Sequence, residues 1–113
     1  NDSVQIMDAR SQARFYAKEP EPRKEVRSGR IPSSKSLPYP SLLSKGKMKS
    51  TVDLETVFKE LNPTKQRMVF SCGSGITACV LALGAELAGY NEYAVYDGSW
   101  TEWGSLSYLP IER

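Results

Sequence analysis

The chain has 113 residues, of which 40% are hydrophobic and 25% charged, and its formal net charge at pH 7 is +2. This length suits one compact domain over residues 1–113, and the composition is that of a globular protein rather than a disordered or fibrous one. The basic residues are spread along the chain, so no nucleic-acid interface is indicated. No apolar stretch is long enough to span a membrane, and no signal peptide is visible.

The first third of the chain predicts a strand, a short helix and a long loop. Residues 4–8 are mostly apolar and predict a buried strand, and residues 10–16 are compatible with a helix. Residues 17–36 are polar and rich in proline and glycine, which predicts a long surface loop of the kind that often carries function. Residues 37–40 indicate a second extended segment.

The middle of the chain predicts a helix followed by a strand, a tight turn and a second helix. Ser50, with Asp53 three residues later, resembles the capping box that starts a helix, and Pro63 ends that helix. Residues 67–71 are the most strand-like core segment. They lead directly into a glycine-rich turn and an apolar helix that extends to residue 88.

The last elements complete an alternating pattern of strands and helices. Residues 92–96 predict a strand and residues 101–104 a short helix. This alternation predicts an α/β fold with a mostly parallel central sheet and helices on both of its faces. Functional sites in such sheets lie beyond the carboxyl ends of the strands, where Asp8, Cys72 and Asp97 are expected.

The sequence CGSGIT at residues 72–77 places a thiol in the turn between a strand and a helix. Inward-pointing backbone amides and the N-terminus of the helix both stabilise negative charge, and thiolates in such positions have depressed pKa values. The chain contains no histidine, so the imidazole base that often activates a cysteine is absent. The turn therefore predicts Cys72 as a nucleophile that its backbone surroundings activate, with Ser74 and Thr77 as hydroxyl donors to the sulfur or to a bound anion.

The alternative interpretation is that Cys72 is buried and inert and that the glycines only form a tight turn, since nucleophile elbows and phosphate loops share this geometry. Cys79 lies between apolar neighbours and is predicted to be a small buried hydrophobic residue. Two cysteines seven residues apart suit neither a structural disulfide nor a known zinc pattern. A reducing compartment therefore fits best.

A cysteine phosphatase is the nearest competing chemistry, because it also holds an anion over a thiolate in a backbone loop. That enzyme needs an arginine six residues after the cysteine to bind phosphate through two hydrogen bonds. Position 78 is an alanine. The same lack of a cation in the loop weakens the interpretation as an arsenate reductase.

Two arginines are candidate ligands for a substrate carboxylate, because arginine binds carboxylates with two parallel hydrogen bonds. Arg14 and Arg23 flank an acidic, proline-containing stretch, and their spacing alone favours surface residues paired with Glu19 and Glu21. Further polar residues are predicted to support the scaffold: Asp8 by bonding the turn after it, and Asp97, Ser99, Trp100 and Trp103 by fixing the last turn and helix.

Taken together, six segments of the chain resemble the rhodanese superfamily, specifically the C-terminal catalytic domain of 3-mercaptopyruvate sulfurtransferases. The segments are residues 8–10, 13–15, 19–23, 28–32, 72–77 and 96–103, of which CGSGIT and YDGSWTEW are the most specific. One departure is Arg30, which stands where relatives usually have a histidine in a motif similar to GHIP.

The resemblance implies a double-displacement reaction. The Cys72 thiolate takes a sulfane sulfur from 3-mercaptopyruvate or thiosulfate, which forms a persulfide, and passes it to a thiol or to cyanide. Arg14 and Arg23 would hold the carboxylate and carbonyl end of the donor, and Ser74 would lie nearest the thiolate. The residues implied to surround the sulfur are Gly73, Ser74, Gly75, Ile76 and Thr77. The loop carries no cation, which favours mercaptopyruvate over the thiosulfate dianion.

The resemblance also sets expectations for partners and location. Relatives are usually tandem proteins, so an N-terminal rhodanese-like domain that helps to close the site is expected to be missing here. The acceptor would be a thiol such as that of a thioredoxin-like protein, no cofactor or metal is expected, and the compartment would be the cytosol or the mitochondrion. The alternative from another functional class is a non-catalytic rhodanese-like module that binds a partner.

Overall fold

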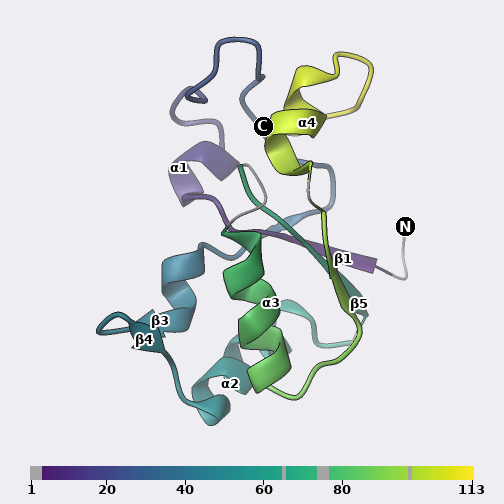
Figure 1. Cartoon of the computed structure of the whole chain (residues 1–113). Helices are drawn as coiled ribbons and strands as arrows, with labels where there is room; N and C mark the ends of the chain where they lie inside the picture. The colour runs from purple at the N-terminus through teal and green to yellow at the C-terminus, as the bar shows by residue number, and fades with distance from the viewer. Residues whose placement is uncertain (1–3, 65, 74–76, 97) are drawn as a thin grey trace.

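The computed structural model describes residues 4–64, 66–73, 77–96 and 98–113 (Figure 1). In this part of the chain, no helix is both long and apolar enough to cross a membrane. The elements are, in chain order, β1 (Val4–Asp8), α1 (Gln12–Phe15), β2 (Lys35–Ser36), the 3-10 helix η1 (Tyr39–Leu42), β3 (Leu43–Ser44), β4 (Lys47–Met48), α2 (Thr51–Leu61), β5 (Arg67–Ser71), α3 (Ala78–Leu87), β6 (Tyr93–Val95) and α4 (Ser99–Ser105).

The central sheet has the strand order β2-β1-β5-β6, and every neighbouring pair is parallel. This confirms the α/β fold with a mostly parallel sheet. Strands β3 and β4 form a separate antiparallel pair. In the register of the central pair, Asp8 lies opposite Ser71, so β1 and β5 end at the same level and Cys72 follows at this edge.

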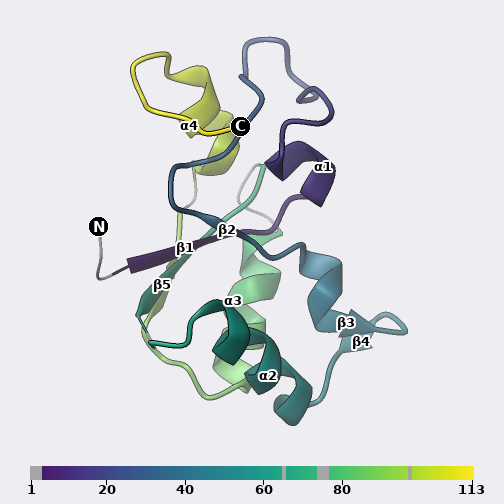
Figure 2. The same ribbon diagram turned by 180° about the vertical axis from the view of Figure 1, so that it is seen from behind.

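Two apolar clusters cover the opposite faces of the sheet. Consecutive residues of a strand point to opposite faces, so Met7 of β1 belongs to one cluster and Ile6 to the other. The larger cluster joins the sheet to α2 and α3, and the smaller one joins it to α4 and to the loop that follows α1. Figures 1 and 2 show α1 and α4 together at one end of the molecule, with α2 and α3 toward the other end.

The strongest local sequence signals are confirmed. The segments predicted as strands at residues 4–8 and 67–71 coincide with β1 and β5. Helix α2 begins after Ser50, whose Oγ accepts a hydrogen bond from the backbone N–H of Asp53 at 3.2 Å. This bond satisfies a donor that has no partner within the helix, as the capping motif predicts.

The prediction of an extended segment at residues 37–40 is wrong for its second half. Strand β2 is only two residues long and ends at Ser36, and η1 begins at Tyr39. The physical reason is Pro40 in the first turn of η1: proline lacks an N–H and its φ is already that of a helix, so it is well tolerated there. The proline-rich composition alone does not distinguish these two outcomes.

Candidate functional site

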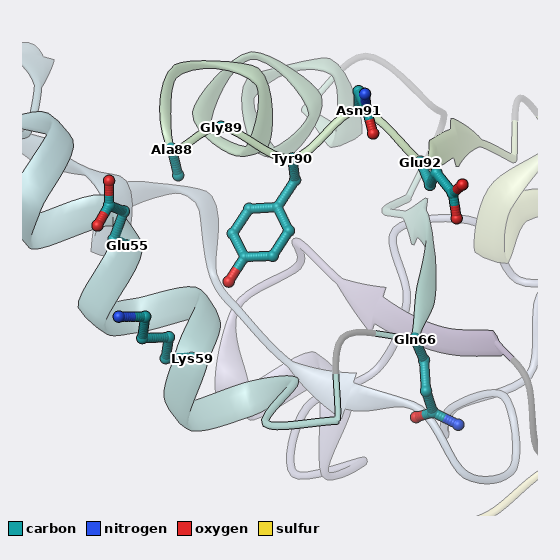
Figure 3. A pocket seen from close by; sticks show the side chains of 8 residues that line it. All are labelled: Glu55, Lys59, Gln66, Ala88, Gly89, Tyr90, Asn91 and Glu92. Carbon is teal, nitrogen blue, oxygen red and sulfur yellow. The ribbon is translucent and has the colours of Figure 1, made fainter.

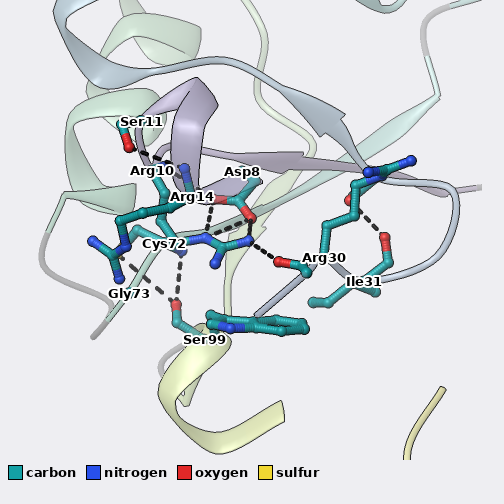
Figure 4. A network of polar contacts seen from close by, with 12 residues as sticks. Asp8, Arg10, Ser11, Arg14, Arg30, Ile31, Cys72, Gly73 and Ser99 are labelled. Atoms are coloured by element: carbon teal, nitrogen blue, oxygen red, sulfur yellow. Dashed lines mark hydrogen bonds and ion pairs between the residues drawn. The ribbon is translucent and has the colours of Figure 1, made fainter. Parts of the chain in front are cut away.

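Cys72 follows the last residue of the central strand β5 and is 1% exposed. Its backbone N–H donates to Ser99 Oγ at 3.0 Å, and the Ser99 hydroxyl lies 4.0 Å from the Cys72 sulfur (Figure 4). A serine hydroxyl has one proton, and the carbonyl of Tyr96 accepts from Ser99 Oγ at the shorter distance of 2.7 Å. Ser99 therefore acts mainly by holding the backbone of Cys72 in place.

Helix α4 fixes the segment around the cysteine through its first backbone amides. The N–H of Trp100 donates to the carbonyl of Cys72 at 2.8 Å, and the N–H of Thr101 donates to the carbonyl of Gly73 at 2.8 Å. The Thr101 hydroxyl adds a second bond to the Gly73 carbonyl at 2.6 Å. These contacts orient two consecutive peptide units, so the direction of the chain at the thiol is set by α4 as well as by β5.

Ser99 has a backbone conformation that non-glycine residues seldom adopt. Its φ is +49°, in the left-handed region, and the residue is completely buried. Such a conformation costs on the order of 1 kcal/mol and persists only where the surroundings enforce it. The strain at Ser99 is consistent with a residue that is held in place to contact the cysteine.

Beside Cys72, a buried chain of ion pairs runs from Asp8 through Arg10 and Glu21 to Arg14. Arg10 Nη2 lies 2.7 Å from Asp8 Oδ2, and Arg10 Nη1 lies 3.3 Å from Glu21 Oε2. Glu21 in turn accepts from Nη2 of Arg14 at 2.7 Å and from its Nε at 3.2 Å. The side chains of the first three residues are at most 2% exposed, whereas that of Arg14 is 26% exposed.

Arg14 is the end of this network that faces the cysteine segment. A Cβ atom built on Gly73 would lie 2.9 Å from Arg14 Nη2, so the guanidinium occupies space that only a glycine leaves open. The side-chain hydrogen bonds to Glu21 raise the pKa of Arg14 above its usual value, with the Glu21 charge adding to the effect. Arg14 is thus a permanent cation beside the residue that follows Cys72.

The two predicted arginines meet at one cavity of about 210 Å³, which is lined by Arg14, Glu21, Pro22, Arg23, Val26, Gly73 and Thr101. The charges of Asp8, Arg10, Glu21 and Arg14 cancel within the network. Arg23 forms no ion pair with any described residue and lends the cavity a net positive charge. The cavity can therefore accept a small monoanion next to the cysteine segment.

The other residues predicted for the site do not line this cavity or are not described by the structure. Ser74, Gly75 and Ile76, together with the strand-end residue Asp97, lie outside the described residues. Thr77 directly precedes α3, where its side chain makes no capping hydrogen bond, and it does not line the cavity.

Two predictions on single residues have opposite results. Cys79 is exposed, so the prediction that it is buried is wrong. Helix α3 is apolar on nearly every side, and its sequence therefore does not reveal which face turns inward. The turn bond predicted for Asp8 is confirmed, because the backbone N–H of Arg10 donates to Asp8 Oδ1 at 2.9 Å.

Four residues of the site were missed or given a lesser role in the sequence: Arg10, Glu21, Ser99 and Thr101. The Arg14–Glu21 pair was considered only as a solvated surface pair, whereas the Glu21 side chain is almost fully buried. Ser99 was assigned to the scaffold but contacts Cys72 directly. The available signal was the specific segment at residues 96–103, which contains both hydroxyl residues of α4 that reach the cysteine segment.

A larger cavity, of about 430 Å³, lies at the opposite end of the sheet (Figure 3). It is formed between α2, the start of β5 and the loop from α3 to β6, and it includes Lys59, Gln66 and Tyr90. It lies at the N-terminal ends of β5 and β6, whereas Cys72 follows the carboxyl end of β5. The smaller cavity, not this one, brings together Arg14, Arg23 and Gly73, which the sequence predicted to bind the donor.

The parallel sheet, with a cysteine just beyond a central strand and an arginine-lined cavity next to that segment, defines an α/β domain with a buried thiol beside a positively charged cavity. The model of the rhodanese-like domain family matches residues 1–106. The chain belongs to this family, which confirms the resemblance inferred from its motifs.

Known relatives extend the comparison. The chain is 44% identical to the mitochondrial thiosulfate/3-mercaptopyruvate sulfurtransferase 1 of Arabidopsis thaliana, over 97% of this chain and 30% of that protein. It is 38% identical to the 3-mercaptopyruvate sulfurtransferase of Escherichia coli strain K12, over 98% of this chain and 40% of that protein. The crystal structure of Tum1 from Saccharomyces cerevisiae matches with a TM-score of 0.81 at 33% identity, over 99% of this chain and 41% of that one. The chain thus spans less than half the length of these relatives.

Proposed function

We propose that this domain is a sulfurtransferase that moves a sulfane sulfur from 3-mercaptopyruvate, or from thiosulfate, to a thiol or cyanide acceptor through a persulfide on Cys72. The observation that carries the proposal is the position of Cys72, one residue before a glycine against which a permanently charged arginine lies. Relatives at 38–44% identity that are named as sulfurtransferases support the same reaction class.

In the first half of the reaction, the Cys72 thiolate attacks the sulfur of mercaptopyruvate. The new S–S bond forms while the C–S bond breaks, and its electron pair passes to carbon to give the enolate of pyruvate, which takes up a proton. In the second half, an acceptor thiolate attacks the outer sulfur and Cys72 leaves as a thiolate. Splitting the transfer into two displacements is the general advantage of a covalent intermediate.

Arg14 and Arg23 have complementary roles in this proposal. Arg14 is held by the buried Glu21 and offers a fixed positive charge to the keto-acid end of the donor as negative charge develops there. Arg23 is exposed and has no ion pair with a described residue. Its side chain can therefore change its conformation to bind the donor carboxylate in the cavity. A cavity with one net positive charge suits the monoanionic mercaptopyruvate better than the thiosulfate dianion.

By family resemblance, the backbone of residues 73–77 surrounds the transferred sulfur, and Ser74 contributes the hydroxyl nearest to it. A thioredoxin-like thiol is the proposed acceptor, and the cytosol or the mitochondrion is the proposed compartment. Because the relatives are more than twice as long as this chain, we also propose that a second rhodanese-like domain helps to enclose the donor.

Two other functions fit the structure less well. A phosphatase needs a cation in the cysteine loop, but position 78 is a buried alanine at the start of α3. A non-catalytic binding module would have no use for a buried acid that holds an arginine against the cysteine segment. Maintaining buried charges is costly unless their positions serve a purpose.

The direct test is the intact mass of the reduced domain after incubation with 3-mercaptopyruvate, with pyruvate measured in the same sample. We expect the mass of one sulfur atom to be added and pyruvate to be released in equal amount, and a small thiol should then remove the sulfur. Thiosulfate in a parallel sample compares the two donors. If neither donor adds sulfur, the domain by itself does not carry out the first half of the reaction.

Replacing Gly73 with alanine should slow sulfur uptake about tenfold to a hundredfold, because misplacing a catalytic group by about 1 Å has effects of this size. The new methyl group displaces the guanidinium of Arg14, whose tip is partly exposed and can swing outward. The displacement also loosens the bonds of Arg14 to the buried Glu21, so the free energy of unfolding should fall by about 1–3 kcal/mol. The rate of adduct formation and a urea titration measure the two effects separately.

A double-mutant cycle shows whether Gly73→Ala acts through Arg14. In a chain that already carries Arg14→Met, which has no guanidinium to displace, Gly73→Ala should change the rate little further. An equally large additional loss in that background would mean that the methyl group acts directly on the cysteine segment, and the proposed role of Gly73 would be wrong.

A further inference from the structure

The guanidinium of Arg30 is half-buried and has few polar partners in the described part of the chain. Its side chain is 19% exposed, and Nη1 is buried without a hydrogen-bond partner among the described residues. Its one ionic contact is from Nε to Glu112 Oε1 at 3.5 Å, and that carboxylate is 47% exposed. Partly exposed pairs at such a distance contribute little, so Arg30 retains most of its capacity to bind an anion.

The surroundings hold this guanidinium in place without using its hydrogen-bond donors. Its central carbon lies 5.1 Å from the ring centroid of Phe15 and 5.5 Å from that of Tyr16. Phe15 is the last residue of α1, Tyr16 follows it directly, and the faces of both rings attract the cation. A guanidinium that is oriented by stacking while its N–H groups stay open is arranged for a planar, two-oxygen partner such as a carboxylate.

A cavity of about 340 Å³ adjoins Arg30, a volume typical of sites for small molecules. Its polar lining includes Lys35 and Ser36 of β2. Ser36 Oγ is buried and, like Arg30 Nη1, has no partner among the described residues. Lys35 donates to the carbonyl of Leu61 at 2.6 Å and adds a second positive charge.

Apolar groups also line this cavity, namely the rings of Phe15 and Tyr16 and the side chain of Leu61, beside the polar residues Gln12 and Ser34. In Figure 4, the Arg30 side chain points away from Cys72 and Gly73, so this cavity is separate from the one that contains Arg14 and Arg23. Two cations, one partly exposed acid and an apolar wall together favour a monoanion with an apolar body.

We propose that Arg30, Lys35 and Ser36 form a second binding site, for a small carboxylate with an aromatic or branched apolar body. The carboxylate would bond to the open N–H groups of Arg30 and to the Ser36 hydroxyl, and the body would pack against Leu61 and the α1 rings. Binding would satisfy two buried polar groups that otherwise lack partners, which is the main reason to expect a ligand there. The proposal does not depend on sulfur transfer.

The test is a titration of the isotopically labelled domain with benzoate, followed by the amide signals in two-dimensional NMR spectra. We expect binding in about the millimolar range, with shifts at Phe15, Tyr16 and Ser36 that are larger than any shift at Gly73. Benzamide, which has the same shape without the charge, should bind at least about tenfold more weakly. Larger shifts at Gly73 than at Ser36, equal binding of benzamide, tighter binding of inorganic phosphate, or no binding of benzoate would each overturn the proposal.

Single-residue variants show whether benzoate binds at Arg30 or is attracted only by the overall positive charge of the domain. Arg30→Met keeps the unbranched stem against the rings and should weaken benzoate binding about tenfold or more, whereas Arg23→Met removes the same charge from the other cavity and should leave binding unchanged. Glu112→Gln removes a competing anion and should strengthen binding about threefold. Ser36→Ala should weaken benzoate binding about threefold, and it tests the site even if Arg30→Met does not fold. Equal losses in Arg30→Met and Arg23→Met, or unchanged binding in Ser36→Ala, would overturn the proposal.

Discussion

A Cys72→Ser variant should take up no sulfur from 3-mercaptopyruvate and should release no pyruvate above the rate measured without protein. The reason is chemical: a serine hydroxyl at neutral pH is not ionised and cannot form the S–S bond on which the proposed intermediate depends. The fold should be retained, because serine is close to cysteine in size and the backbone contacts of Cys72 to Ser99 and Trp100 do not involve its sulfur. Intact mass and pyruvate release measure the loss, and a far-ultraviolet CD spectrum checks the fold.

Cys79→Ser is the matched control, because it makes the same change at the other cysteine of the chain. Cys79 is exposed on α3, so its thiol is the easier of the two for a reagent to reach from solution. If exposure decided reactivity, the sulfur would be found on Cys79. We expect the opposite result: Cys79→Ser should take up sulfur at nearly the wild-type rate, because the arginine-lined cavity that would bind the donor lies beside Gly73.

The two variants therefore decide between the interpretations of Cys72 that its sequence left open. Sulfur on Cys72 despite its 1% exposure would show that the donor reaches the thiol through its binding site. An adduct that persists in Cys72→Ser and disappears in Cys79→Ser would mean that Cys72 is an inert core residue. The proposed function would then have to be abandoned.

Sequence reasoning worked best where a local pattern has one structural meaning. Apolar residues at 67–71 followed directly by a glycine-rich turn and an apolar helix have few alternatives to a buried strand that leads into a turn. The structure has β5 there, at the centre of the sheet, with Cys72 directly after it. The start of α2 was equally clear, because the serine cap and its partner are only three residues apart.

Reasoning from residue type failed where the outcome depends on distant parts of the chain. Arg10 and Glu21 look like surface residues because charged side chains are seldom buried. They are buried because Asp8, Arg14 and the carbonyl of Gly29 supply enough partners to replace water. Their burial depends on how the long loop folds back onto the end of β1. No local sequence pattern predicts this position of the loop.

Arg10→Met should lower the free energy of unfolding by about 3–5 kcal/mol, the usual result of removing one partner of a buried ion pair. Arg10 bonds to both oxygens of Asp8, lies 3.3 Å from Glu21, donates to the carbonyl of Gly29 and stacks 4.7 Å above the ring of Trp100. Methionine retains some of the packing on the ring but leaves two carboxylates buried with too few partners. Urea denaturation of both proteins at pH 7 measures the difference.

Arg67→Met is the matched control, because it removes the same kind of side chain from an exposed position at the start of β5. Its loss should change the free energy of unfolding by no more than about 0.5 kcal/mol. A deficit in Arg10→Met that is below about 1 kcal/mol, or that is no larger than that of Arg67→Met, would show that the network does not hold this end of the domain together.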